Sequence, residues 1–119
     1  MIDWGETVTR LLHRWDEIAL EKITEMISQK IVAGEREMLA QIYLKRGALV
    51  PMHTHESEQM TYVLQGALKF HVDGDEVTVR EGEVLHIPSG TPHQAEALED
   101  TFELDVFSPV RSDWLRGSG

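Results

Sequence analysis

The sequence predicts one all-β domain, built as a barrel or a sandwich of short strands. From Ile23 onward, short runs of alternating character are interrupted by glycine at regular intervals, which is typical of such folds. Turns are expected at 34–35, 73–75 and 81–82, where glycine stands beside acidic residues. The length of 119 residues fits a single compact core and leaves no room for a second domain.

The expected strands lie between these turns. They are placed at 23–33, 36–45, 50–55, 58–65, 67–72, 76–80, 83–88, 92–97 and 101–108. A short amphipathic helix is expected at 7–18, where apolar residues recur at helical spacing, and it would cover an open end of the barrel. The chain is therefore divided into an N-terminal arm (1–22), the barrel (23–116) and a tail (117–119) that we expect to be a cloning remnant.

The composition limits the classes of partner and the compartment. The formal net charge of -10 argues against nucleic acid and against an anionic membrane surface. The chain has no cysteine, which excludes disulfides and thiolate ligands and fits a reducing compartment. The apolar runs are too short to span a bilayer, and the first residues lack the pattern of a signal peptide. We therefore expect a cytoplasmic protein.

Two stretches carry residues that suit a metal ion. His53 and His55 are two residues apart, so both imidazoles leave the same face of an extended segment, and Gln59 can share that face. His93 follows a second strand and a turn rich in proline and glycine. Neutral imidazoles suit Zn, Cu, Fe or Ni, and an uncharged amide oxygen would leave the charge of a divalent ion unneutralised. The sequence therefore predicts an electrophilic metal centre held by these four side chains.

These stretches resemble the two motifs of the cupin family. The first reads Gly-x5-His-x-His-x3-Gln-x6-Gly from Gly47 to Gly66, with Gln59 where the family motif has Glu. The second reads Gly-x5-Pro-x-Gly-x2-His-x3-Ala from Gly82, with Ala97 in place of Asn. The resemblance implies a single-domain double-stranded β-helix, or jelly-roll barrel, with one divalent metal such as Ni, Fe, Mn, Zn or Cu. The alternative is a barrel that keeps the turns but has lost the metal.

The last expected strand supplies a second group of residues. Asp105 and Phe107 share one strand face, and Arg111 follows where the chain can fold over the cavity mouth and clamp a carboxylate. For each residue a structural alternative is open: Asp105 in an ion pair, Phe107 in the core, and Arg111 paired with Asp113 at the surface. The remaining histidines are interpreted as structural or exposed, namely His13, His71 and His86.

The segment from Leu98 to Leu115 resembles the C-terminal signature of the KdgF-type pectin-degradation cupins. The resemblance covers roughly residues 30–115 and includes an Asp-x-Phe-Ser-Pro-x-Arg run. It implies that the three histidines and Gln59 bind the metal and that Asp105, Phe107 and Arg111 act on the substrate. The implied activity converts a 4,5-unsaturated uronate, a small carboxylated sugar, to its linear keto form.

Two other classes of function are open alternatives. A metal-dependent dioxygenase, of the quercetinase or diketone-cleaving kind, would consume oxygen. A ligand-binding cupin without catalytic activity would need the pocket but no group that transfers a proton. In the preferred reading the metal acts as a Lewis acid and Asp105 as a general acid or base.

The parity of the strands predicts an apolar outer face. If Gln59 points inward, Thr61, Val63 and Gln65 do so too, and Met60, Tyr62 and Leu64 point outward. In the last strand the outer face is wholly apolar, with Phe102, Leu104 and Val106. Such a surface needs cover from a second sheet or from a twin subunit, so a homodimer is expected.

Overall fold

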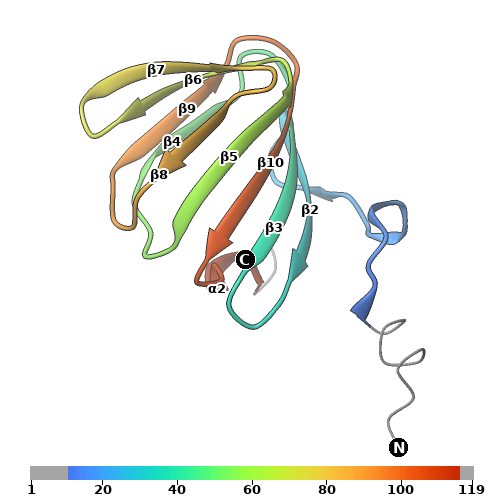
Figure 1. Cartoon of the computed structure of the whole chain (residues 1–119). Coiled ribbons are helices and arrows are strands. Elements are labelled where there is room, and N and C mark those ends of the chain that lie inside the picture. Colours follow the sequence, from blue (N-terminus) through green and yellow to red (C-terminus); the bar gives the residue numbers. More distant parts are fainter. Residues whose placement is uncertain (1–10, 116–119) are drawn as a thin grey trace, which may run out of the picture.

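The computed structural model describes residues 11–115, which fold into two antiparallel sheets that face each other as a flattened barrel (Figure 1). The larger sheet has the order β1 (Glu21–Lys22), β2 (Ile27–Ala33), β3 (Met38–Leu44), β10 (Thr101–Ser108), β5 (Glu58–Gln65) and β8 (Val84–Ile87). The smaller sheet has the order β4 (Leu49–His53), β9 (His93–Ala97), β6 (Ala67–Val72) and β7 (Asp75–Arg80). This double-sheet jelly roll confirms the predicted fold class.

The N-terminal segment differs from the prediction. Of the helix expected at 7–18, residues 7–10 lie outside the described part, and at 12–18 the helical structure is limited to η1 (Trp15–Glu17). That single 3-10 turn lacks a capping side chain, because Arg14 precedes it in an extended conformation and makes no capping hydrogen bond. The predicted amphipathic helix is therefore absent at 12–18, although Leu11 is helical.

The strand expected at 23–33 is present from Ile27 onward as β2, whereas residues 23–26 form the turn between β1 and β2. The backbone N–H groups of Ile23 and Thr24 both donate to the Ile27 carbonyl, and the Thr24 hydroxyl accepts from the Met26 N–H at 3.0 Å. Such side-chain to backbone bonds compete with a sheet ladder and favour a turn. The sheet consequently begins at β1, which pairs with β2.

The burial of the central strands follows the predicted parity. In β10, Glu103, Asp105 and Phe107 point inward and are 5%, 3% and 0% exposed, whereas the alternate residues are only half-buried. In β3, Met38, Ala40 and Ile42 point inward in the same way. The space between the sheets therefore contains both the apolar core and two carboxyl groups.

One parity prediction is wrong, and a β-bulge explains it. Gln65 was expected inside but is exposed. In the pairing of β5 with β10, Glu103 faces Val63 whereas Phe102 faces Gln65, so Leu64 is an extra residue. An extra residue reverses the alternation beyond it. The next residue is Gly66, with φ of +92°, where a Cβ atom would lie 2.5 Å from the Asp100 carbonyl oxygen, so this turn requires glycine.

A short helix, α2 (Ser112–Leu115), follows β10 and lies at the lower end of the barrel in Figure 1. Trp114 of this helix is partly buried and packs against the core. Among residues 11–115, no helix is long and apolar enough to cross a membrane.

Candidate metal centre and ligand cavity

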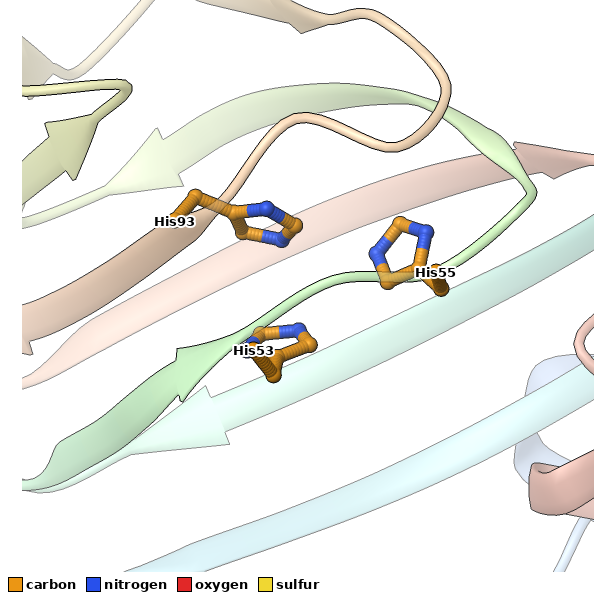
Figure 2. Close-up of side chains that lie close together, drawn as sticks. All are labelled: His53, His55 and His93. Atoms are coloured by element: carbon orange, nitrogen blue, oxygen red, sulfur yellow. The ribbon is translucent and has the colours of Figure 1, made fainter.

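Three histidines converge at one end of the space between the sheets (Figure 2). His53 ends β4 and His93 begins β9, and the two are direct partners in the antiparallel ladder. His55 lies in the connection to β5, and its carbonyl oxygen accepts from the Gly90 N–H at 2.9 Å in the turn before β9. One ligand atom from each ring lies within 4.8 Å of those of the other two. Strand register and this loop contact therefore create the three-histidine group.

Each histidine is oriented by a backbone carbonyl two residues away. The acceptors are Pro51 for His53, Ser57 for His55 and Thr91 for His93, each 2.8 Å from the ring Nδ1. A carbonyl can only accept, so the proton is on Nδ1 and the Nε2 lone pair is free. The Nε2 atom of His93 is buried and has no hydrogen-bond partner among residues 11–115. Metal-binding histidines commonly have this arrangement of a fixed Nδ1–H and a free Nε2.

The electrostatic environment favours the neutral form of the His93 and His55 rings. Burial lowers the pKa of His93 to about 4, despite the hydrogen bond to Thr91. Burial also lowers the pKa of His55, and the charge of Arg111 adds to that effect. Because only a neutral imidazole can bind a metal ion, the group is ready for a cation at neutral pH.

The orientation of Gln59 supplies a test of whether a cation fits. The Gln59 Nε2 donates to the Thr61 hydroxyl at 2.8 Å, so Gln59 Oε1 must face His55 Nε2, at 3.0 Å. With the His55 proton on Nδ1, two lone pairs then face each other, which is unfavourable unless a cation lies beside both. Metal bonds of about 2.1 Å at right angles place two ligand atoms about 3.0 Å apart. The donor set therefore fits a divalent ion, with the amide oxygen where a fourth ligand would lie.

Asp105 is linked to the same group by hydrogen bonds. The Thr61 hydroxyl accepts from Gln59 and donates to Asp105 Oδ1 at 2.6 Å. Burial raises the pKa of Asp105 to about 6, and the hydrogen bond from Thr61 and the charge of Arg111 limit the rise. Asp105 forms no ion pair within residues 11–115, so the ion-pair alternative does not hold there. A carboxyl that titrates near neutrality suits proton transfer.

Phe107 and Arg111 complete the wall beside the histidines. Phe107 is fully buried and meets the His55 ring edge-on, with centroids 5.7 Å apart. The Arg111 guanidinium carbon lies 4.2 Å from the centre of the Trp114 ring and 5.4 Å from that of Phe107. Phe107 is therefore both a core residue and a cavity residue. Sequence reasoning missed Trp114, although an aromatic residue three positions after Arg111 was a signal for stacking.

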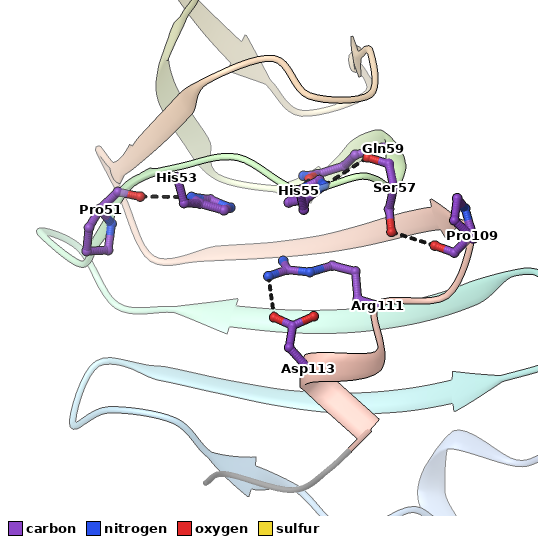
Figure 3. A network of polar contacts seen from close by, with 8 residues as sticks. All are labelled: Pro51, His53, His55, Ser57, Gln59, Pro109, Arg111 and Asp113. Atoms are coloured by element: carbon purple, nitrogen blue, oxygen red, sulfur yellow. Dashed lines mark hydrogen bonds and ion pairs between the residues drawn. The ribbon is translucent and has the colours of Figure 1, made fainter.

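Arg111 pairs with Asp113, as one of the two alternatives predicts, but its side chain is not at the surface. Its Nη2 donates to Asp113 at 2.8 Å (Figure 3), yet its side chain is only 10% exposed, against 63% for Asp113. The Nε atom is buried and has no hydrogen-bond partner in the part of the chain that the structure describes. The Ser57 hydroxyl donates to the Pro109 carbonyl at 2.5 Å, which ties the loop of His55 to the segment that carries Arg111. The guanidinium thus has a free N–H inside the cavity wall.

The cavity that these side chains enclose has a volume of about 630 Å³. It is lined by the predicted residues His53, Gln59, His93, Asp105, Phe107 and Arg111. Among the polar residues to which sequence reasoning gave no role, Glu21, Gln29 and Glu103 also line it. His71 and His86 lie outside this lining and face solvent, where His86 pairs with Glu58 and His71 approaches Glu76.

A jelly roll with three inward histidines at one end of a buried cavity defines a class of small barrels that fit a metal ion. Residues 41–108 match the cupin domain family, and the chain belongs to that family. The fold and the two sequence motifs agree with this assignment.

Similar proteins place the chain further within the family. KdgF from a Halomonas species is 35% identical with a TM-score of 0.78, over 83% of this chain and 94% of that one. The chain is a small cupin that resembles the KdgF type. An oxalate-binding protein of Thermotoga maritima is 28% identical over 78% of this chain and 88% of its own length. An uncharacterised protein of Methanocaldococcus jannaschii is 31% identical to this chain. The aligned region covers 64% of this chain and 62% of the length of that relative.

Proposed function

We propose that this cupin binds a divalent metal through His53, His55, Gln59 and His93 and converts a 4,5-unsaturated uronate to its linear keto form. The observation that carries the proposal is Asp105, a buried carboxyl with a pKa of about 6 that shares one cavity with His53, His93 and Arg111. The similarity to KdgF from Halomonas supports it. A bound ion such as Ni, Fe, Mn, Zn or Cu would supply Lewis-acid polarisation of a substrate oxygen.

Arg111 and Phe107 would position the substrate. The free Nε–H of Arg111 and its Nη2–H can both donate to one carboxylate, once Asp113 moves aside. Asp113 is mostly exposed and can be displaced without leaving a buried charge. Phe107 offers a ring surface to the apolar face of a sugar.

Asp105 would transfer the proton. In the proposed isomerisation, the ring C–O bond breaks, the hemiacetal hydroxyl becomes an aldehyde, and the ring oxygen leaves as an enol. The enol becomes a ketone when the neighbouring alkene carbon takes a proton, so one proton moves from oxygen to carbon and no oxidant is needed. Asp105 can accept and return that proton, because its pKa of about 6 is close to neutrality.

The test follows the unsaturated monomer by its ultraviolet absorbance. We expect the protein to remove that absorbance and Asp105→Asn to slow the reaction by about 10²- to 10⁴-fold, the usual size of a general acid–base contribution. His71→Ala changes a solvent-facing histidine and serves as the control. Equal rates with and without the protein would contradict the uronate assignment.

A second candidate is binding of a small carboxylate without turnover. It is favoured by the similarity to the oxalate-binding protein of Thermotoga maritima. Saturable binding with no product, and an Asp105→Asn variant that binds as the wild type does, would support it. Oxygen uptake would instead support the dioxygenase alternative.

We also propose that two copies associate through the outer face of the larger sheet in the cytoplasm. Exposed apolar side chains gather on its neighbouring strands, namely Leu39, Tyr43, Met60, Tyr62 and Val84. Water-exposed apolar surface of this kind favours association. Light scattering should give twice the chain mass, and Tyr62→Lys should reduce that mass towards one chain. An unchanged monomer mass for the wild type would exclude this dimer.

A further inference from the structure

The cavity continues beyond Asp105 to a second polar group, far from the histidines. Glu103 pairs with Ile42 in the ladder of β10 and β3, Ile42 pairs with Gln29 of β2, and Gln29 pairs with Glu21 of β1. Glu103, Gln29 and Glu21 therefore lie on one row across the larger sheet, with Ile42 between Glu103 and Gln29. All three line the cavity. We call these three residues the distal acidic group.

Glu103 is the member with unused hydrogen-bonding capacity. Its side chain is inside and the residue is 5% exposed. Its Oε2 atom is buried and has no hydrogen-bond partner within the described residues 11–115. Burial raises the pKa of Glu103 well above its ordinary value, and the negative charge and hydrogen bonding of Asp105 raise it further. A protonated carboxyl has one O–H and one carbonyl oxygen. If the O–H of Glu103 donates to Asp105, the other carboxyl oxygen of Glu103 is a free hydrogen-bond acceptor.

The two ends of the cavity therefore prefer opposite chemical groups. At the histidine end, Arg111 offers a free N–H, and the histidines offer a site for a cation. At the distal end, a ligand meets the carboxyl groups of Glu103 and Glu21 and the amide of Gln29. A hydroxyl can donate to the free Glu103 oxygen. A carboxylate has no proton to donate and would lie close to the carboxylates of Asp105 and Glu21, which is costly away from water.

We infer that the cavity selects a linear hydroxylated acid with one carboxylate, which binds to Arg111, and a hydroxyl at the other end, which binds to Glu103 of the distal acidic group. This inference deepens the proposed function and rests on it for the carboxylate at Arg111. It adds that the same carbon chain with a carboxylate at both ends is rejected. Glu103 acts as a specificity-determining residue.

The distance along β10 between Phe107, which Arg111 contacts, and Glu103 suits such a ligand. From the row of Phe107 to the row of Glu103 is four residues along β10, or about 13 Å at the usual rise of a strand. A chain of about six carbons, with bonds of about 1.5 Å and a hydrogen bond of about 2.8 Å at each end, spans this distance. A two-carbon acid would leave the distal acidic group unused.

The experiment compares D-galactonate with galactarate by titration calorimetry on the protein as purified. Both are linear six-carbon acids with the same hydroxylated middle, and they differ only at one end, which is a hydroxymethyl group in the first and a carboxylate in the second. We expect galactonate to bind at least about tenfold more tightly, which is about 1.4 kcal/mol. Glu103→Leu should weaken galactonate by about tenfold, and Glu81→Gln, which removes an exposed turn carboxylate, should change neither ligand.

Each outcome decides the inference. Equal or tighter binding of galactarate by the wild type would overturn it, as would binding of neither acid or an unchanged galactonate affinity in Glu103→Leu. If Glu103→Leu does not fold, Glu103→Gln replaces it; its amide N–H can meet a carboxylate, so the preference against galactarate should shrink. Failure of the proposed function is a separate result, namely unchanged ultraviolet absorbance of the unsaturated monomer while the galactonate preference persists.

Discussion

The two ends of the cavity are built in different ways. At the histidine end, each ring is fixed by a carbonyl two residues away, so short segments of the chain define the ligand geometry. At the distal end, Glu103, Gln29 and Glu21 come from three strands and are brought together by the register of the sheet. The histidine end, with Arg111 and a site for a cation, accepts a carboxylate of the ligand. The distal end resists a carboxylate. A ligand that spans both therefore has its orientation set by opposite charge preferences.

The largest effect is expected from removing one histidine. His93→Ala removes a buried ligand whose free Nε2 points into the group, and the two remaining histidines with Gln59 should hold the ion poorly. We expect the metal content, measured by elemental analysis of purified protein, to fall from about one ion per chain to near zero, since a lost ligand removes more than the 10- to 100-fold affinity typical of a lost outer-shell partner.

The control for this change is His71→Ala. His71 is partly exposed near Glu76 and lies outside the cavity lining, so its variant should keep the ion. Retention of a full complement of metal by His93→Ala, with no change in unfolding temperature, would show that the histidine end is not a metal centre. The distal acidic group would then be the main determinant of ligand chemistry.

Arg111→Lys tests the cationic side of the comparison. Lysine keeps the charge but loses the planar pair of N–H groups and the stacking on Trp114. We expect KM for the unsaturated uronate to rise by about 10- to 100-fold, with a smaller change in kcat, because the arginine binds a part of the substrate that does not react. Steady-state kinetics on the metal-loaded protein measure this. Arg80→Lys, in a surface strand, is the matched control, and an equal response of the two variants would refute a carboxylate clamp.

The contrast between the two ends also explains what the sequence could predict. His53, His55 and Gln59 lie within seven residues, and their spacing alone indicated a shared face. Asp105 and Phe107 followed from alternation along one strand. Gln29 and Glu21, in contrast, share a row with Glu103 only through the registers of three ladders. A bulge at Leu64 changed the parity of Gln65. Register between strands that are distant in sequence is set by packing of the whole sheet, so local pattern does not reveal it.

Thr61→Val breaks the hydrogen-bonded connection between the two ends. The Thr61 hydroxyl orients the Gln59 amide and donates to Asp105, and valine keeps the shape but has no hydroxyl. Because the hydrogen bond from Thr61 lowers the pKa of Asp105, its loss should raise that pKa further. If Asp105 acts as a base, the rising limb of the rate–pH profile should move to higher pH, and the rate near neutrality should fall by about tenfold. A profile that coincides with that of the wild type would show that Asp105 does not carry the proton.

The smallest expected effect is on the free energy of unfolding, which the buried Glu103 carboxyl lowers near neutral pH. The pKa of Glu103 is raised in the folded state above its ordinary value of 4.5, so the folded protein holds a proton that the unfolded chain releases. The contribution of Glu103 to stability is therefore complete below about pH 4.5 and declines as the pH rises towards the folded pKa. Glutamine cannot ionise and avoids this loss.

Glu103→Gln should accordingly be more stable than the wild type by about 1 kcal/mol near neutral pH, with a margin that narrows towards pH 4.5. Chemical denaturation of both proteins at several pH values measures the difference in their free energies of unfolding. Taking this difference at each pH cancels the opposite contributions of His55 and His93, whose pKa values are lowered. Glu81→Gln, at an exposed turn, should show a margin near zero throughout. A margin for Glu103→Gln that stays flat with pH would mean that this carboxyl is ionised in the folded protein, and the distal end would then favour a cationic group over a hydroxyl.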